Sequence, residues 1–432
     1  KLLKLARKAK SLGVELFVLD DGWFGDRNTD TAGLGDYDVN LRKLPGGLGD
    51  FSKRIEDMGM RFGLWFEPES VNVDSKLYRA HPDWAIKPPK GEPSFGRNQL
   101  LLDLTQSCVR DYIVESVGNV LDSAKISYVK WDMNRHMSDA YSKQLDNQGE
   151  FYHRYILGLY EILGRIFGPR PYILFESCSS GGNRFDLGML CYSPQVWSSD
   201  DTDPIERLDI QGGLSYLYPQ STMGAHVSAA PHQQTLRDTP LSTRFNVAAF
   251  GVLGYELEFK YMSRVELKEI KGQVEFYKKH RKTLQFGRFY RFDERKDNKV
   301  HWQISAPDGS EHIVGHFQKL CTASEGYDEL PVKGLDKNAR YRLKCKTQSL
   351  FIKRLGGLIK HVMPIELNPD GFILRTANKF FAMPDGAENL EASGAALMSG
   401  IKLNNQFLGT GYNDRIHMFG DFGSAIYTIE KL

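Results

Sequence analysis

A chain of 432 residues exceeds the usual span of one hydrophobic core, so we expect two domains, one of them large enough to be an α/β barrel. Its 41% hydrophobic, 25% charged and 12% aromatic residues are typical of a soluble globular protein with a large core. With 56 basic against 54 acidic residues, no global field favours nucleic acid or an anionic membrane, so we expect neither partner and a small neutral ligand instead.

The cysteines are odd in number, widely separated and without a CxxC pair, which indicates neither a disulfide framework nor a zinc site. They are Cys108, Cys178, Cys191, Cys321 and Cys345. No apolar run reaches the roughly 20 residues that a membrane helix needs, and no signal-peptide pattern follows Lys1. A reducing, cytoplasmic location is therefore the simplest expectation.

The first predicted element is an amphipathic helix over residues 1–12, where apolar residues recur at three- and four-residue spacings before Gly13. Short apolar runs that end in a polar or acidic residue then recur along the chain. These predicted strands are residues 14–20, 61–67, 100–103, 126–132, 172–176 and 195–200, with a seventh strand and its extension within 245–259. Helix patterns such as 50–58 and 148–167 separate them.

Buried strands that alternate with helices and end in polar residues are typical of a parallel barrel with its site at the strand carboxyl ends. A doubly wound open sheet has strands of the same form and is the alternative. A (β/α)8 TIM barrel also needs a strand before its first helix. None precedes residues 1–12, so we expect an N-terminally incomplete chain whose barrel lacks its first strand.

The residue pattern of the sequence changes after a last helix pattern at about 265–284. Short runs broken by Asp-Asn, Pro-Asp-Gly and Gly turns there predict antiparallel strands. These runs are residues 288–292, 300–304, 312–317, 341–346 and 426–432. We therefore expect a barrel domain over residues 1–288 and an antiparallel β-sandwich over residues 289–432.

Acidic residues gather at the predicted strand ends. Two carboxylic acids that face one pocket are what the cleavage of a glycosidic bond requires. The candidates are Asp20, Asp21, Glu67, Glu69, Asp103, Asp132, Glu176, Asp200, Asp201 and Asp203. Each taken singly is equally well explained as a helix cap or a loop ion pair, so composition does not rank them.

The segment 130–135 (KWDMNR) is more specific. The two-residue period of a strand puts Lys130, Asp132 and Asn134 on one face. A lysine two residues away would hold Asp132 ionised, as a nucleophile requires. A strand-end salt bridge is the alternative.

Residues 200–203 crowd three carboxyl groups, and like charges at such spacing raise the pKa of at least one, as a general acid needs. A divalent-metal cluster is the rival interpretation, but such a site normally draws ligands from several strand ends. The loop 176–183 is rich in glycine and lacks the ending of a phosphate-binding loop, which favours close approach to a neutral ligand. Cys178 in it forms either a small wall of the site or a plain buried residue.

Five motifs give the chain a resemblance to a known family over its whole length. They are LDDGWFG at 19–25, GLWFEPE at 63–69, KWDMNR at 130–135, FESC at 175–178 with its glycine-rich loop, and WSSDDTDPIER at 197–207. In order and approximate spacing they resemble the α-galactosidases of glycoside hydrolase family 36.

The resemblance implies a retaining α-galactosidase that needs no metal or cofactor and acts on terminal α-galactosides of the melibiose or raffinose type. It implies that Asp132 forms a covalent galactosyl intermediate, and that Asp200 protonates the departing oxygen and then deprotonates water. It further implies that Asp20 and Asp21 hold the galactose 4- and 6-hydroxyls and that Trp65 walls the ring. The residues implied to line the remainder of the site are Arg97, Lys130, Asn134, Cys178 and Gly181.

The chain also departs from the family pattern. Asp201 stands where similar enzymes often carry Asn, which favours Asp200 as acid/base and keeps Asp201 as the alternative. The family's N-terminal β-sandwich and first barrel strand are not in this sequence, so a galactoside-binding fragment without turnover is a second hypothesis. An α-N-acetylgalactosaminidase or transglycosidase of the same family is a third, and a homo-oligomer is compatible with all of them.

Overall fold

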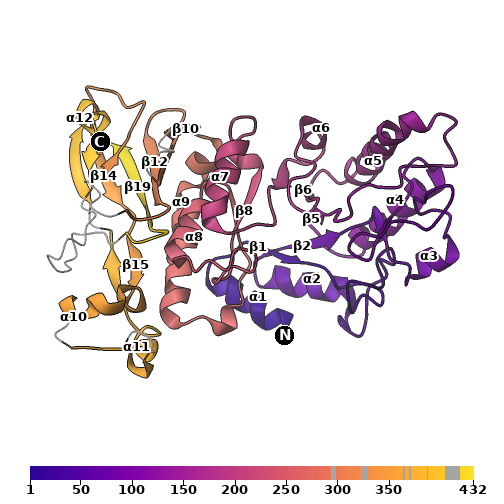
Figure 1. Ribbon diagram of the computed structural model, residues 1–432, viewed down its shortest axis with the longest axis horizontal. Helices are drawn as coiled ribbons and strands as arrows, with labels where there is room; N and C mark the ends of the chain where they lie inside the picture. The colour runs from indigo at the N-terminus through magenta and orange to yellow at the C-terminus, as the bar shows by residue number, and fades with distance from the viewer. Residues whose placement is uncertain (293–297, 323–327, 363–364, 369–370, 387, 404–418) are drawn as a thin grey trace. The chain divides into compact units, whose positions relative to one another are not determined.

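The computed structural model describes the chain except residues 293–297, 323–327, 363–364, 369–370, 387 and 404–418 (Figure 1). The chain divides into two compact units, residues 1–200 and 201–432. Among the residues described, no helix is long and apolar enough to cross a membrane.

The first unit is built on parallel strands that are hydrogen-bonded in the order β1-β2-β5-β6-β7. They are β1 (Leu16–Leu19), β2 (Arg61–Phe66), β5 (Tyr128–Trp131), β6 (Leu174–Ser177) and β7 (Gln195–Trp197). The helices of the unit are α1 (Leu2–Ser11), α2 (Gly47–Asp57), α3 (Lys76–Ala80), α4 (Ser107–Asp122), η1 (Gln148–Glu150), α5 (Phe151–Phe167) and α6 (Leu187–Leu190). Helix α2 packs against β2, and α4 packs against α5 (Figure 1).

The strands of this unit carry its core. Leu64 on β2, Val129 on β5 and Phe175 on β6 are all at most 1% exposed, as expected of parallel strands that are covered on both faces. The register pairs Trp65 with Lys130 across β2 and β5 and continues onto β6. Residues that directly follow these strands therefore meet at one edge of the sheet.

Most of the elements predicted for the first unit are confirmed, from the helix at residues 1–12 to the strand at 195–200. The prediction that residues 100–103 form a strand of the parallel sheet is wrong. Leu100–Leu101 (β4) pairs antiparallel with Ser70–Val71 (β3) in a separate two-stranded ribbon. A leucine run is buried equally well in either setting, so its apolar character did not distinguish them.

The second unit begins with further parallel β/α elements. Strands β8 (Met223–Val227) and β9 (Val252–Tyr255) pair in parallel. The helices are α7 (Pro204–Leu214), α8 (Leu241–Ala248) and α9 (Arg264–Phe286), with η2 (Gln220–Thr222) and η3 (Phe259–Tyr261) between them. The strand predicted within 245–259 is β9, but that range begins inside α8, and β8 was not predicted from the sequence.

Side chains mark where two of these helices begin. The Asp203 side chain accepts a hydrogen bond from the Ile205 N–H and caps α7, and Pro204 fits the first turn. Helix α9 begins with a capping box between Ser263 and Glu266.

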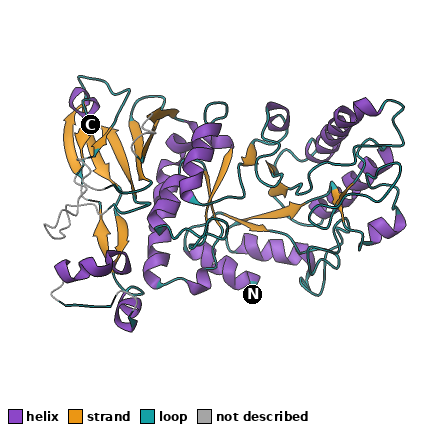
Figure 2. Ribbon diagram, in the orientation of Figure 1, coloured by secondary structure: helices purple, strands orange, loops and turns teal. Residues whose placement is uncertain are grey.

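The C-terminal part is antiparallel, and Figure 2 shows its strands in orange. A six-stranded sheet has the order β10-β11-β12-β19-β14-β17. Its strands are β10 (Arg288–Phe292), β11 (Lys299–Ser305), β12 (Glu311–Gln318), β19 (Ser424–Lys431), β14 (Arg340–Cys345) and β17 (Asn389–Ser393). All five strands predicted for this region are confirmed.

Two smaller antiparallel sheets complete the part of this region that the structure describes. They pair β13 (Glu329–Leu330) with β18 (Ile401–Lys402), and β15 (Gln348–Phe351) with β16 (Ala382–Asp385). The short helices are η4 (Ile352–Leu358), α10 (Ile359–Val362), α11 (Phe372–Ala377) and α12 (Gly394–Met398). These were not predicted, because two- to seven-residue elements leave no clear period in the sequence.

Candidate active site

A cluster of polar side chains lies at the carboxyl ends of β2, β5 and β6. The Asp132 N–H donates to the Phe66 carbonyl at 2.7 Å, and the Cys178 N–H donates to the Trp131 carbonyl at 2.7 Å. These ladder bonds bring the residues that follow the three strands into one row. Glu67, Asp132 and Cys178 occupy that row, and all three are buried.

Asp132 is held by three donors. The Trp65 Nε1–H at 3.2 Å and the Asn134 Nδ2–H at 2.8 Å both donate to its Oδ2, and the Met133 N–H donates to its Oδ1 at 2.9 Å. The residue is 6% exposed. Together these three donors fix the orientation of the Asp132 carboxylate.

Lys130 lies on β5 and pairs with Asp20, whereas the sequence suggested Asp132 as its partner. Its Nζ pairs with Asp20 Oδ2 at 3.3 Å and lies 5.8 Å from the Trp197 ring centroid. Burial alone would lower the pKa of Lys130, but negative charge around it, that of Asp20 foremost, raises the pKa. The ammonium therefore stays charged among the strand-end acids.

The two aspartates after β1 have different environments. The Asp20 side chain is 61% exposed and contacts Lys130. Asp21 accepts hydrogen bonds from Arg27 Nε at 3.1 Å and Nη2 at 2.9 Å. The Arg27 side chain is only 4% exposed and also donates to Asn72 at 3.1 Å. Arg27 fixes one of the two predicted substrate-binding acids and was not itself predicted from the sequence.

Trp65 is buried rather than presented on an open wall. It is 3% exposed, and its ring stacks on Phe24 at 6.2 Å between centroids with an interplanar angle of 7°. The Trp23 Nε1–H donates to its carbonyl at 2.9 Å. The contact that Trp65 makes with the strand-end cluster is its own Nε1–H bond to Asp132.

The glycine-rich loop after β6 packs against the segment that carries Asp200. Gly181 has φ +87°, and a Cβ there would lie 2.9 Å from Ser199 Cα and 3.1 Å from the Asp200 nitrogen. Only glycine permits this approach without strain. The Ser180 hydroxyl of the same loop donates to Asn134 Oδ1 at 3.2 Å, which ties the loop to the end of β5.

Cys178 precedes that loop and is 2% exposed. Burial, followed by the charge of Asp132, raises the pKa of its thiol well above the ordinary value. Cys178 is therefore a neutral thiol beside Asp132 and not a thiolate nucleophile.

Asp200 and Asp201 fall in different units. Asp200 is exposed and accepts a hydrogen bond from Trp197 Nε1–H at 2.9 Å. In the second unit, Asp201 Oδ1 accepts the Asp203 N–H at 2.9 Å.

Asp203 itself is buried. Burial opposes its ionisation, but hydrogen bonds from Thr235 and Ile205 and the charge of Arg237 lower its pKa. Asp203 therefore acts as a helix cap and ion-pair partner.

Arg97 lies in a left-handed turn with φ 52°, before β4, and is exposed. Its charge lowers the pKa of Glu67. Glu67 is 0% exposed, and burial followed by repulsion from Asp132 raises its pKa to about 7. Glu67 is one of the strand-end acids predicted from the sequence, where no role was assigned to it.

The remaining strand-end acids have structural partners. Glu176 accepts a hydrogen bond from Gln195, and Asp103 accepts from Thr105 N–H at 3.1 Å and from the Ser142 hydroxyl at 2.6 Å. Within the described ranges, no group of three His, Cys, Asp or Glu is arranged to hold a metal ion. The expectation that no metal is needed stays a prediction.

Glu69 forms a buried ion pair with Arg184. Arg184 Nη1 lies 2.8 Å and 3.0 Å from its two carboxylate oxygens, and Trp131 Nε1–H and the Tyr155 hydroxyl also donate to them. Glu69 is 0% exposed, so Arg184→Met would leave a buried charge without its cation. We expect a loss of about 3–5 kcal/mol in the free energy of unfolding, measured with urea.

Arg165→Met is the matched control for that measurement. Arg165 pairs with Asp111 at 2.7 Å, but the two side chains are 40% and 62% exposed. Such a pair contributes less than about 1 kcal/mol. Equal losses of unfolding free energy in the two variants would show that the buried ion pair stabilises the fold no more than the exposed one.

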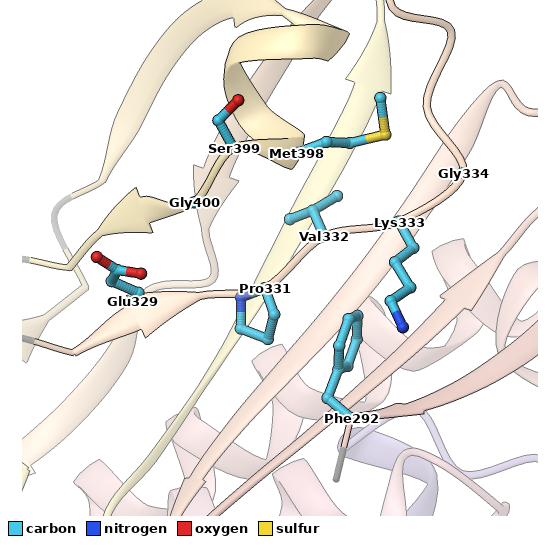
Figure 3. Close-up of a pocket in the computed structure, with 9 residues that line it drawn as sticks. All are labelled: Phe292, Glu329, Pro331, Val332, Lys333, Gly334, Met398, Ser399 and Gly400. Carbon is cyan, nitrogen blue, oxygen red and sulfur yellow. The ribbon is translucent and has the colours of Figure 1, made fainter. Parts of the chain in front are cut away.

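A hollow of about 450 Å³ lies elsewhere, in the second unit (Figure 3). Its lining residues are Phe292, Glu329, Pro331, Val332, Lys333, Gly334, Met398, Ser399 and Gly400. The Lys333 ammonium lies 5.1 Å from the Phe292 ring centroid in a cation–π contact. None of these residues belongs to the strand-end cluster, and none was predicted as a site residue.

Comparison with known proteins identifies the family. Residues 1–287 match the family described as Melibiase, and residues 299–429 match the glycosyl hydrolase family 36 C-terminal domain. The chain belongs to the melibiase family. The resemblance to family 36 that the five motifs indicated is thereby confirmed.

Individual members of the family show the same relationship. The chain is 50% identical over 347 residues to α-galactosidase AgaA of Geobacillus stearothermophilus. This match covers 80% of this chain and 48% of that enzyme. Crystal structures of two AgaA variants, one with raffinose and one with stachyose, are each 41% identical and match 100% of this chain and 53% of theirs, with TM-scores of 0.84. The fold class of a β/α barrel followed by an antiparallel β domain is confirmed. The chain spans about half the length of the curated relatives it matches.

Proposed function

We propose that this chain is the catalytic part of a retaining α-galactosidase. The observation that carries the proposal is the environment of Asp132: a buried carboxylate, held by three donors, in a row of strand-end side chains. The names of the relatives supply the substrate class. AgaA is named an α-galactosidase, and its variants are described in complex with raffinose and stachyose.

In the proposed reaction, Asp132 attacks the anomeric carbon and forms a galactosyl ester while the glycosidic bond breaks. Asp200 gives its proton to the departing oxygen. It then takes a proton from water, whose oxygen displaces Asp132 from the sugar. Two inversions at one carbon return the α configuration. Asp201 is the alternative acid/base.

The binding roles are proposed in the same way. Asp20 and Asp21 would accept hydrogen bonds from the galactose 4- and 6-hydroxyls, which distinguishes galactose from glucose through the axial 4-hydroxyl. Arg27 supports this role because it holds Asp21 in one orientation. Trp65, Arg97, Lys130, Asn134, Cys178 and Gly181 would complete the pocket. We further propose the domain boundary between residues 288 and 289.

Rates on three substrates test the proposal. We expect the chain to release galactose from an aryl α-galactoside and from raffinose, with little turnover of the matching aryl α-N-acetylgalactosaminide. A faster rate on the acetamido sugar would favour the α-N-acetylgalactosaminidase alternative. Calorimetric binding of galactose without hydrolysis of any substrate would favour the binding fragment. Transfer of galactose to a second sugar in place of water would favour the transglycosidase.

A further inference from the structure

Glu67 is a buried acid without an assigned role beside the proposed nucleophile. It follows β2 directly and is 0% exposed. Its Oε1 accepts the Asn134 N–H at 2.6 Å, and its Oε2 accepts the Gln99 Nε2–H at 3.2 Å. Burying a carboxylate is costly, and such groups are retained where their hydrogen bonds hold another part of the structure in place.

The partner that Glu67 holds leads directly to Asp132. Asn134 lies past the end of β5, where the strand ladder no longer fixes the chain. Its N–H is bonded to Glu67, and its side-chain Nδ2–H is bonded to Asp132 Oδ2 at 2.8 Å. Asn134 is thus a bridge: one end is fixed by Glu67, and the other end orients the Asp132 carboxylate.

Charged and polar groups from several elements surround Glu67. Asp132 acts on it from the end of β5 and Arg97 from the loop before β4, and the Tyr37 hydroxyl accepts its N–H at 3.2 Å. The pKa of Glu67 is raised to about 7, first by burial and then by Asp132, while Arg97 lowers it. Gln99 can bond to Glu67 in either protonation state. Its amide can donate to the ionised carboxylate or, when turned, accept a hydrogen bond from the protonated acid.

We propose that Glu67 is a positioning residue, which fixes the Asn134 main chain so that the Asn134 amide aims the Asp132 carboxylate at the anomeric carbon. This inference rests on the proposed role of Asp132 as nucleophile. Because Glu67 is 0% exposed, it would not touch the sugar itself. Its removal should therefore reduce the rate of the chemical step and leave substrate binding nearly unchanged.

Three variants test this on an aryl α-galactoside, with kcat and KM measured separately and galactose as a competitive inhibitor. Glu67→Ala removes the acceptor, and we expect kcat to fall on the order of 100-fold, as for a displaced reacting group, with KM and the galactose inhibition constant changed by less than about 3-fold. Glu67→Gln keeps an oxygen that accepts the Asn134 N–H and should recover kcat to within about 5-fold of the parent chain. Asp103→Asn is the matched control: a buried acid of the same unit, bonded to Thr105 and Ser142, whose loss should change kcat by less than about 2-fold.

An unchanged kcat in Glu67→Ala overturns the inference. So does a Glu67→Gln variant whose kcat falls as far as that of Glu67→Ala and whose KM rises. If the alanine variant does not fold, Glu67→Asp tests the inference in its place. The shorter side chain no longer reaches the Asn134 N–H, so kcat should fall without a matching change in KM, and an unchanged kcat overturns the inference. Asp132→Asn is assayed alongside. An active Asp132→Asn means that the proposed function has failed, whereas an inactive one beside a fully active Glu67→Ala means that only the present inference has failed.

Discussion

Asp132→Asn is expected to lower kcat on an aryl α-galactoside by at least about 10⁴-fold. The amide keeps the size of the side chain and leaves the three donors in place, but it cannot form the galactosyl ester. In Asp132→Gly, which removes the side chain, azide should occupy the vacated space beside the anomeric carbon, restore part of the turnover and leave as a glycosyl azide. Release of aryl alcohol with and without azide, and detection of the azide product, provide the measurement.

The control for this experiment is Asp103→Asn, since it makes the same chemical change at a buried acid away from the row of strand-end residues. Azide should leave its rate unchanged. Full activity of Asp132→Asn in the absence of azide would contradict the assignment, and the other acids of the row would then have to be tested in its place.

Asp200→Ala should have an effect that depends on the leaving group. Raffinose has a poor leaving group that must be protonated as it departs, so kcat/KM should fall on the order of 10³-fold. The leaving group of a dinitrophenyl galactoside departs as a stable phenolate and needs no proton, so kcat/KM for that substrate should fall by less than about 10-fold. The ratio of the two losses is the measured quantity.

Asp201→Ala is the matched variant for that comparison. In the structure, Asp201 accepts the N–H of Asp203, and its Oδ1 lies 3.8 Å from His232 Nδ1. We expect equal and modest losses on both substrates in this variant. If Asp201→Ala discriminates between the leaving groups and Asp200→Ala does not, Asp201 is the acid/base.

Periodicity predicted the long elements of the fold well. Residues 1–12 repeat apolar side chains at helical spacing, and α1 covers Leu2–Ser11. The strand at 100–103 was misassigned because its antiparallel partner is only two residues long and leaves no pattern. Strand β8 (Met223–Val227) was missed because a glycine and a histidine interrupt its apolar residues.

The candidate site was predictable to the extent that it follows strand ends. Asp132, Lys130 and Cys178 all stand at the carboxyl ends of short apolar runs, so their proximity could be inferred from the order of the strands. The contacts that orient them could not. The Glu67 bond to the Asn134 N–H joins residues 67 positions apart, and neither position carries a period that indicates the other.

Arg27 illustrates the same limit. Its ion pair with Asp21 spans six residues through a turn, and a buried arginine in a loop has no sequence signal that separates it from an exposed one. A loop conformation must be known before such a pair can be recognised.

The stereochemistry of the first product tests the central proposal most directly. Hydrolysis of an aryl α-galactoside is followed by proton NMR from the first minutes, before mutarotation mixes the anomers. A galactosyl ester on Asp132 predicts that α-galactose appears first and that the β anomer grows in later. β-Galactose as the first product would show a single displacement by water, and would contradict the nucleophilic role of Asp132.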